Sequence, residues 1–161
     1  MDATRKPRRW PISGLVLSAA LTLCSGFAFS AEVTAPAGKV KRSEGGVTVD
    51  HAGQLLPAPV GTPVFVGDRI RTASDGSVGV TLSDDTLLTA GPNSTLLIND
   101  FKFDTTTEEG GMLATLVKGT LSVVTGLIAK QQPEKVRFKT PNVVLGVRGT
   151  EFIIEARGED E

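Results

Sequence analysis

His51 is the only histidine in the chain, and it directly follows Asp50. An imidazole beside a carboxylate could serve as a general base if a nucleophile stood within hydrogen-bond reach. The stretch His51-Ala52-Gly53 offers no nucleophile that its spacing identifies. We therefore interpret His51 as a residue of a surface turn.

Asp84 and Asp85 are adjacent carboxylates that could bind calcium or act as a catalytic pair. Adjacent residues of a strand point to opposite faces, and no loop of spaced oxygen ligands accompanies them. A hairpin turn is the favoured interpretation. No G-x-S-x-G segment occurs either. The sequence assigns no catalytic, cofactor-binding or metal-binding residue, and it predicts a protein that is not an enzyme and needs no cofactor.

Arg71 and Arg148 each lie among residues that a hydrophobic core would take. A buried guanidinium needs a carboxylate or backbone carbonyls to offset its desolvation. Asp68, Asp84 and Glu151 are the candidate partners. The arginines either tie strands together or recognise the carboxylate of a ligand or protein partner.

Short apolar alternations broken by turn residues run along the chain from Val40. A period of two sends successive side chains to opposite faces of a sheet, as in 78–82 and 86–90. Asp75-Gly76 suits a tight turn, so residues 64–82 are predicted to form a two-stranded hairpin. With little room for helices, the pattern predicts one all-β domain.

Two segments combine an apolar face with a charged one. Phe101 and Phe103 alternate with charged residues whose face we expect to meet water. In 135–139, three cations alternate with Val136 and Phe138. These cations form a solvated, edge-protecting face, or they contact an anion or a partner.

Residues 117–120 and 147–150 match in residue type at each position, thirty residues apart. Such a repeat predicts a solenoid-like course or a rolled sheet. Gly149 also lies where the expected inward-facing positions change from odd-numbered to even-numbered residues. Either a bulge at 148–149 shifts the inward face to Phe152 and Ile154, or the parity is kept and Ile153 is buried.

The first thirty residues have the features of a secretory signal peptide. Four cations precede an apolar helical stretch, 12–29, and small residues precede Ala31. An uncleaved anchor is the alternative. Cys24 could carry a lipid, but Leu23 before it favours an ordinary leader cysteine. The leader predicts a periplasmic or secreted protein, without membrane contact unless the leader stays or Cys24 is lipidated. The expected division of the chain is 1–30 signal peptide, 31–38 lead-in, 39–156 β domain and 157–161 acidic tail.

Net charge and aromatic content limit the classes of partner that the sequence favours. The formal net charge is −1, and removal of the leader, with four cations and one acid, changes it to −4. A mildly acidic surface does not attract nucleic acid by bulk charge. The only tryptophan, Trp10, lies in the leader, and the chain has no tyrosine. A small-ligand or glycan site is therefore a less favoured alternative to a protein partner.

The motifs taken together resemble the FecR domain family. The segments that carry the resemblance are V-G-D-R-I-R-T at 66–72, N-S-T-L-L at 93–97 and the ending T-P-N-V-V-L-G-V-R-G-T-E-F at 140–152. The resemblance extends over most of 33–156. Its candidate motif or interaction residues are Gly67, Asp68, Arg71, Thr72, Thr140, Pro141, Gly146, Arg148, Gly149 and Thr150.

The resemblance implies an extracytoplasmic, all-β, non-catalytic domain. Ferric-citrate-type regulators of this family also have a cytoplasmic anti-sigma-factor domain and a C-terminal part that contacts a TonB-dependent transporter. The sequence shows neither, so we expect a stand-alone exported FecR-like domain. Its expected role is that of an interaction or sensory-scaffold module in envelope signalling, with an unidentified protein partner. Direct regulation of a sigma-factor pathway is less favoured.

Overall fold

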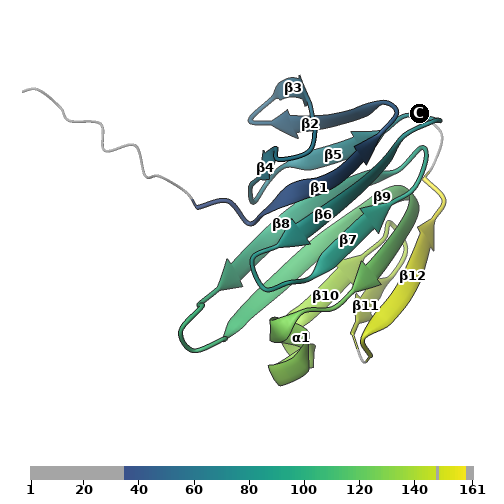
Figure 1. Ribbon diagram of the computed structural model, residues 1–161. Coiled ribbons are helices and arrows are strands. Elements are labelled where there is room, and N and C mark those ends of the chain that lie inside the picture. Colours follow the sequence, from purple (N-terminus) through teal and green to yellow (C-terminus); the bar gives the residue numbers. More distant parts are fainter. Residues whose placement is uncertain (1–34, 148, 159–161) are drawn as a thin grey trace, which may run out of the picture. The chain divides into compact units, whose positions relative to one another are not determined.

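A single curled sheet of 12 strands, nearly all antiparallel, makes up most of the described protein. The computed structural model describes residues 35–147 and 149–158 (Figure 1). Two short helices are present, α1 (Leu127–Gln131) and the 3₁₀ turn η1 (Pro133–Lys135). None of the helices in these ranges is long and apolar enough to cross a membrane. The all-β prediction is confirmed, whereas the predicted leader and Cys24 lie outside the described residues.

The strands are β1 (Gly38–Glu44), β2 (Val47–His51), β3 (Gln54–Pro57), β4 (Pro63–Val64), β5 (Arg69–Thr72), β6 (Ser77–Leu82), β7 (Leu87–Ala90), β8 (Thr95–Phe103), β9 (Gly110–Val124), β10 (Val136–Lys139), β11 (Val144–Gly146) and β12 (Glu151–Ala156).

The long strand β9 belongs to both halves of the curled sheet. Its first part pairs with β8 and, in parallel, with β10, whereas its second part pairs with β7 and β12. Gly119, at φ +93°, lies between the two parts. Half-sheet A thus has the order β4-β1-β6-β7-β9-β12, and half-sheet B has the order β3-β2-β5-β8-β9-β10-β11.

The core lies between the two half-sheets. Alternate residues of the strands are buried, as the period of two requires, and they form one apolar cluster. Phe138 on β10 is fully buried, and its ring meets that of Phe152 on β12 edge to face at a centroid distance of 5.4 Å. Full burial of such a side chain contributes roughly 1.5–3 kcal/mol. The pair therefore stabilises the packing of half-sheet B on half-sheet A.

The predicted hairpin over 64–82 is wrong. The Asp75-Gly76 turn exists, with the Gly76 amide donating to the Ala73 carbonyl at 3.0 Å. However, β5 pairs with β2 and β8, while β6 pairs with β1 and β7. The turn therefore carries the chain from one half-sheet to the other, because each strand finds its partners elsewhere in the sequence.

The two copies of the thirty-residue repeat belong to a rolled sheet. Its second copy leads into β12, which runs antiparallel to the second part of β9, with Ala156 opposite Gly119. A solenoid would stack the two copies in parallel and in register. Of the two predicted arrangements, the rolled sheet is therefore correct.

The structure also decides between the two arrangements that were predicted around Gly149. Ile154 is buried and Phe152 packs against the core, whereas Ile153 is 71% exposed. The alternative in which Ile153 is buried is wrong. The inward face shifts because β11 and β12 belong to different half-sheets and residues 147–150 connect them.

Candidate functional site

Threonine and serine side chains join the two half-sheets where the chain passes between them. The Thr72 hydroxyl donates to the Gly91 carbonyl at 2.6 Å and accepts the Ser94 amide at 2.8 Å. The Thr72 amide donates in turn to the Ser94 carbonyl at 3.0 Å. Thr72 and Ser94 are buried, so these bonds satisfy backbone groups that water does not reach. The motif threonine at position 72 is thus structural.

Ser94 extends the same network to β9. Its hydroxyl accepts the Thr120 amide at 3.0 Å and lies 3.2 Å from the Thr120 carbonyl, to which it donates. A Cβ atom on Gly119 would lie 2.2 Å from the Ser94 oxygen. The glycine of the K-G-T segment is therefore required both by its positive φ and by this close approach. We name the network of Thr72, Gly91, Ser94, Gly119 and Thr120 the corner seam.

Gly67 and Asp68 form a tight turn before β5. The Asp68 amide donates to the Phe65 carbonyl at 3.2 Å, with Gly67 at φ +91°. The Asp68 side chain is 2% exposed, and its Oδ2 accepts the Phe65 amide at 2.8 Å. The aspartate therefore locks the turn at 65–68, where the V-G-D-R-I-R-T segment begins.

His51 is the second partner of that carboxylate. Its Nδ1 lies 2.5 Å from Asp68 Oδ1, and its ring contacts Phe65 at a centroid distance of 5.0 Å. Because an ionised carboxylate only accepts hydrogen bonds, Nδ1 is the donor. His51 ends β2 and borders the two-residue turn Ala52–Gly53 that leads to β3, so it lies beside a surface turn, as interpreted from the sequence. Only the pairing of β2 with β5 brings it to Asp68, and the sequence carries no signal of that pairing.

The His51–Asp68 pair has the geometry of an oriented imidazole, which is one part of a general-base system. The ring is about half exposed, with a side-chain exposure of 47%. No nucleophile is hydrogen-bonded to the ring within the described residues. The pair thus connects β2 to the turn at 65–68 and does not complete a catalytic arrangement there.

Asp84 occupies a hairpin turn, as predicted. The turn joins β6 to β7, and Asp85 takes φ +65°. The buried carboxylate of Asp84 accepts the amide and the hydroxyl of Thr86, at 3.1 and 2.7 Å. The Thr86 hydroxyl also accepts the Gly126 amide at 3.0 Å. These bonds anchor the segment before α1 to the hairpin.

The expectation that Arg71 is buried is wrong. Arg71 is exposed on β5, because Ile70 and Thr72 take the inward positions. Its proposed partners Asp68 and Asp84 are bonded to other groups. No ion pair of Arg71 occurs among the described residues.

The C-terminal motif contributes two turns. Thr140 closes the β10–β11 hairpin, where its amide donates to the Val143 carbonyl at 2.8 Å and its hydroxyl accepts the Val143 amide at 3.2 Å. Pro141 is exposed in this turn, and Gly146 ends β11, exposed as well. Arg148 lies outside the described residues.

Gly149 and Thr150 meet the end of β9. The Thr125 hydroxyl donates to the Gly149 carbonyl at 3.1 Å, and the Thr125 amide donates to the Thr150 carbonyl at 2.8 Å. Gly149 takes φ +148°. The structure thus places the nine predicted residues that it describes, all but Arg148, in separate turns and strands, and it does not bring these nine together into one pocket.

A shallow groove on the outer face of half-sheet B collects the cations of 135–139. Lys135, Arg137 and Lys139 line it with Asp100 and Glu134, over the first part of β9. Arg137 and Lys135 are exposed and Lys139 is half-buried, whereas Val136 and Phe138 are buried on the opposite face. The alternation predicted for this strand is confirmed. We name this surface the cationic groove.

The edge of β11 lies beside the cationic groove. β11 pairs with β10 alone within the described chain, and Val144 stands opposite Lys139. Val143 is 51% exposed and Val144 is 58% exposed. An open strand edge with exposed apolar side chains and neighbouring cations can accept an additional strand.

Comparison with known proteins agrees with this architecture. The chain matches the family described as FecR protein over residues 68–161, from the Asp68 turn to the end of the chain. No curated protein and no solved structure gives a significant match. The matched region contains the corner seam, the cationic groove and the C-terminal motif. The chain therefore belongs to the FecR family.

Proposed function

We propose that this FecR protein is an exported, non-catalytic interaction module that binds a protein partner in the cell envelope. Residues 1–30 direct it to the periplasm or beyond, as their charge and hydropathy indicate. The family is not known as catalytic, which agrees with the absence of an enzyme motif in the sequence. The role as a scaffold in envelope signalling follows from this combination.

One observation carries the proposal: the polar side chains of the motif residues are already hydrogen-bonded to other groups of the domain. Thr72, Ser94 and Asp68 direct their polar atoms to backbone amides and carbonyls or to His51. A catalytic side chain must instead present its polar atom to a substrate. What the domain offers to other molecules is therefore its surface, namely strand edges and sheet faces.

The open edge of β11 is the surface best suited to a partner. A strand added to this edge would gain backbone hydrogen bonds, and its side chains would reach Val144 and the cationic groove. Arg137 and Lys139 favour carboxylates in that strand. The partner segment is thus expected to be extended and acidic.

Affinity capture tests the proposal. The tagged, unmodified chain is incubated with envelope extract, beside the variant Arg137→Glu/Lys139→Glu and the control Arg71→Glu. Arg71 is an exposed cation on β5, on the same half-sheet but away from β11. A partner retained by the control and lost by the double variant supports the proposal.

Two results would contradict it. Equal capture by all three proteins would remove the cationic groove from the binding surface. Turnover of a panel of hydrolase substrates that disappears in a His51→Ala variant would show that the protein is an enzyme.

A further inference from the structure

The outer face of half-sheet A carries no charged side chain over β6, β7 and the second part of β9. Gly79, Thr89, Ser122 and Ile153 lie directly opposite one another on four consecutive strands. Glycine, threonine and serine side chains project little from a sheet, so this row forms a smooth surface. Ile153 at its end is 71% exposed. The row gives half-sheet A a platform of small side chains on which another surface can pack closely.

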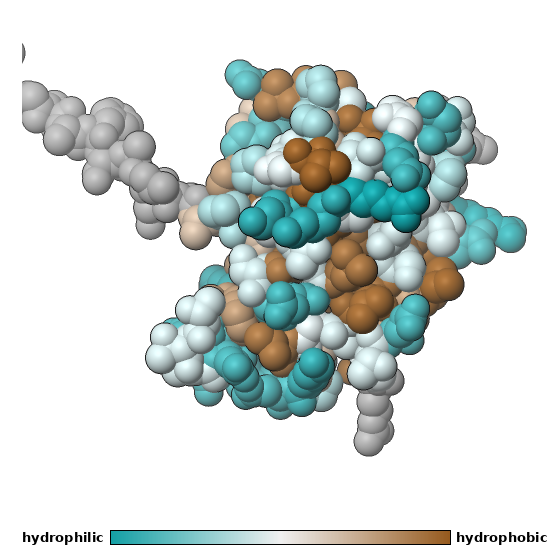
Figure 2. Space-filling model, in the orientation of Figure 1, coloured by the Kyte–Doolittle hydropathy of each residue, from teal (hydrophilic) through white to brown (hydrophobic). Residues whose placement is uncertain are grey.

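A second row runs parallel to the first and ends in opposite charges. Lys39, Thr81, Leu87, Val124 and Glu151 lie opposite one another from β1 to β12. Val124 is 38% exposed and Leu87 is half-buried. Figure 2 shows hydrophobic surface over β7 and β12, next to hydrophilic side chains over β1. The platform is thus uncharged in its middle, cationic on one side and anionic on the other.

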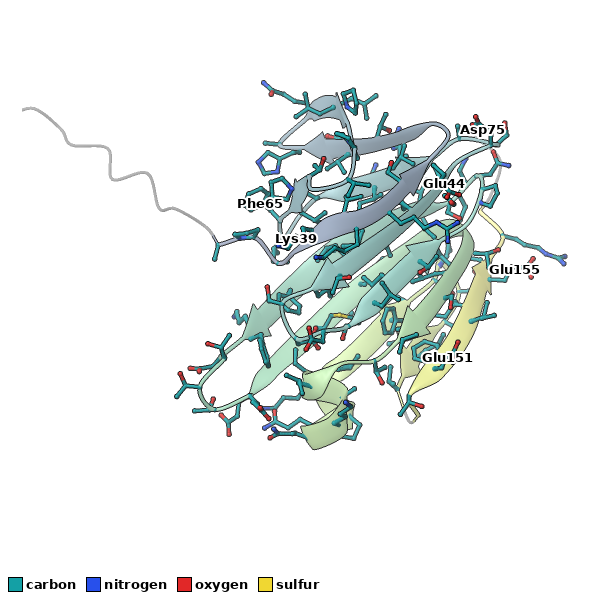
Figure 3. The ribbon with its side chains drawn as sticks, viewed as in Figure 1. Lys39, Glu44, Phe65, Asp75, Glu151 and Glu155 are labelled. Carbon is teal, nitrogen blue, oxygen red and sulfur yellow. The ribbon has the colours of Figure 1, made fainter. Side chains whose placement is uncertain are left out.

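The charges at the two sides differ in whether they are already paired. Arg42 binds Glu44 at 2.9 Å, and Arg157 lies 3.9 Å from Glu155. Neither Lys39 nor Glu151 has an ion pair among the described residues. Figure 3 shows Lys39 on β1 and Glu151 on β12, at opposite sides of the half-sheet. Four strand spacings of about 4.8 Å separate them by roughly 19 Å, too far for contact within one chain.

We infer that the protein forms a two-fold dimer through the outer face of half-sheet A. A two-fold axis along the strands over β7 places β1 of one copy over β12 of the other. Lys39 then faces Glu151 of the second copy, and this contact occurs twice, as an isologous interface requires. Ile153 then lies over Arg42 of the second copy, which continues the first row opposite Gly79 on β1, and packs against its aliphatic part. The row from Lys39 to Glu151 is therefore complementary to a second copy of itself.

The size of the platform sets the expected strength. It measures about 19 Å across the strands and about 20 Å along them, or roughly 400 Å² for each copy. Two copies would bury roughly 800 Å² in total, less than a standard stable interface, so weak and reversible association is expected. The dimer is independent of the partner site, because the cationic groove lies on half-sheet B.

Sedimentation velocity on the whole chain, purified as cells produce it, tests the dimer over a micromolar concentration series. We expect a monomer–dimer equilibrium, which Ile153→Asp weakens at least about tenfold, because a buried isoleucine is replaced by a charge. Leu55→Asp is the matched control, since Leu55 is 60% exposed on β3 in half-sheet B. It should leave the dissociation constant unchanged.

A charge exchange identifies the contact itself. Lys39→Glu and Glu151→Lys should each weaken the dimer severalfold, and the double variant should restore it. Because the two residues cannot meet within one chain, recovery requires contact between copies. An unchanged melting temperature would show that each variant is folded. A chain that stays monomeric at all concentrations, a double variant as weak as the single ones, or equal effects of Leu55→Asp and Ile153→Asp would overturn the inference.

Discussion

Gly119 and Gly67 provide a matched pair of substitutions that isolates the steric role of the corner seam. Both have a positive φ, +93° and +91°, which disfavours any residue with a Cβ atom. Alanine at Gly67 would meet no atom within 4 Å. Alanine at Gly119 would place its Cβ 2.2 Å from Ser94 Oγ and 2.5 Å from Ser94 Cα. The two variants share the backbone strain and differ only in the collision.

The expected magnitudes follow from these two contributions. Backbone strain of this kind costs about 1–3 kcal/mol, and Gly67→Ala should lose that amount of unfolding free energy. Forced displacement in a packed interior adds about 1–3 kcal/mol, so Gly119→Ala should lose roughly 2–6 kcal/mol. The additional loss arises because the backbone of Ser94 has to move away from β9.

Urea denaturation followed by circular dichroism measures both losses, provided that the slope of the transition is unchanged. Ser94→Ala added to Gly119→Ala supplies a further check, since it removes the nearest obstructing atom and should recover part of the difference. Equal destabilisation by Gly119→Ala and Gly67→Ala would refute the close packing of the seam.

Three more predictions concern single hydrogen-bonding groups. Thr72→Val keeps the side-chain shape but removes two hydrogen bonds of the seam, and it should lower the unfolding free energy by about 2–3 kcal/mol in the same denaturation assay. His51→Ala should lower it by about 1–2 kcal/mol, because the buried carboxylate of Asp68 loses a donor; His51→Asn, which retains a donor, should recover part of the loss. Backbone amides of Thr106 and Thr107 lower the pKa of Asp104. The turn that these bonds form should thus persist at neutral pH and be lost as the pH falls through the lowered pKa of Asp104. The amide proton shift of Thr106, measured by NMR, reports this loss. Asp104→Asn is the control, because its side chain does not titrate.

Strand content was predictable because it depends on local pattern. The alternation of Val136 and Phe138 with cations identified both faces of β10, and the structure has the same faces. Asp84–Asp85 was predictable as a turn for the same reason, since turn chemistry acts over two to four residues. Arg71 shows the limit of such patterns, because an arginine among apolar residues still has an outward position available on a strand.

Strand partners were not predictable from the same information. β5 and β6 are neighbours in sequence, joined by a favourable turn, and yet each pairs with other strands. The contact between His51 and Asp68 depends on such pairing, since seventeen residues separate them. The corner seam depends on it too, because Thr72, Ser94 and Thr120 meet only when β5 pairs with β8 and β8 pairs with β9.

The sequence by itself determined the all-β class, the positions of most turns and the FecR resemblance, because these depend on side-chain alternation and on residues that favour turns. The tertiary structure decided which strands pair, where the sheet bends and which polar side chains serve the fold. That decision required the shared core between the half-sheets, because burial of apolar faces selects among pairings that are locally equivalent. The motif glycines and threonines thus have a physical role that their spacing alone did not reveal.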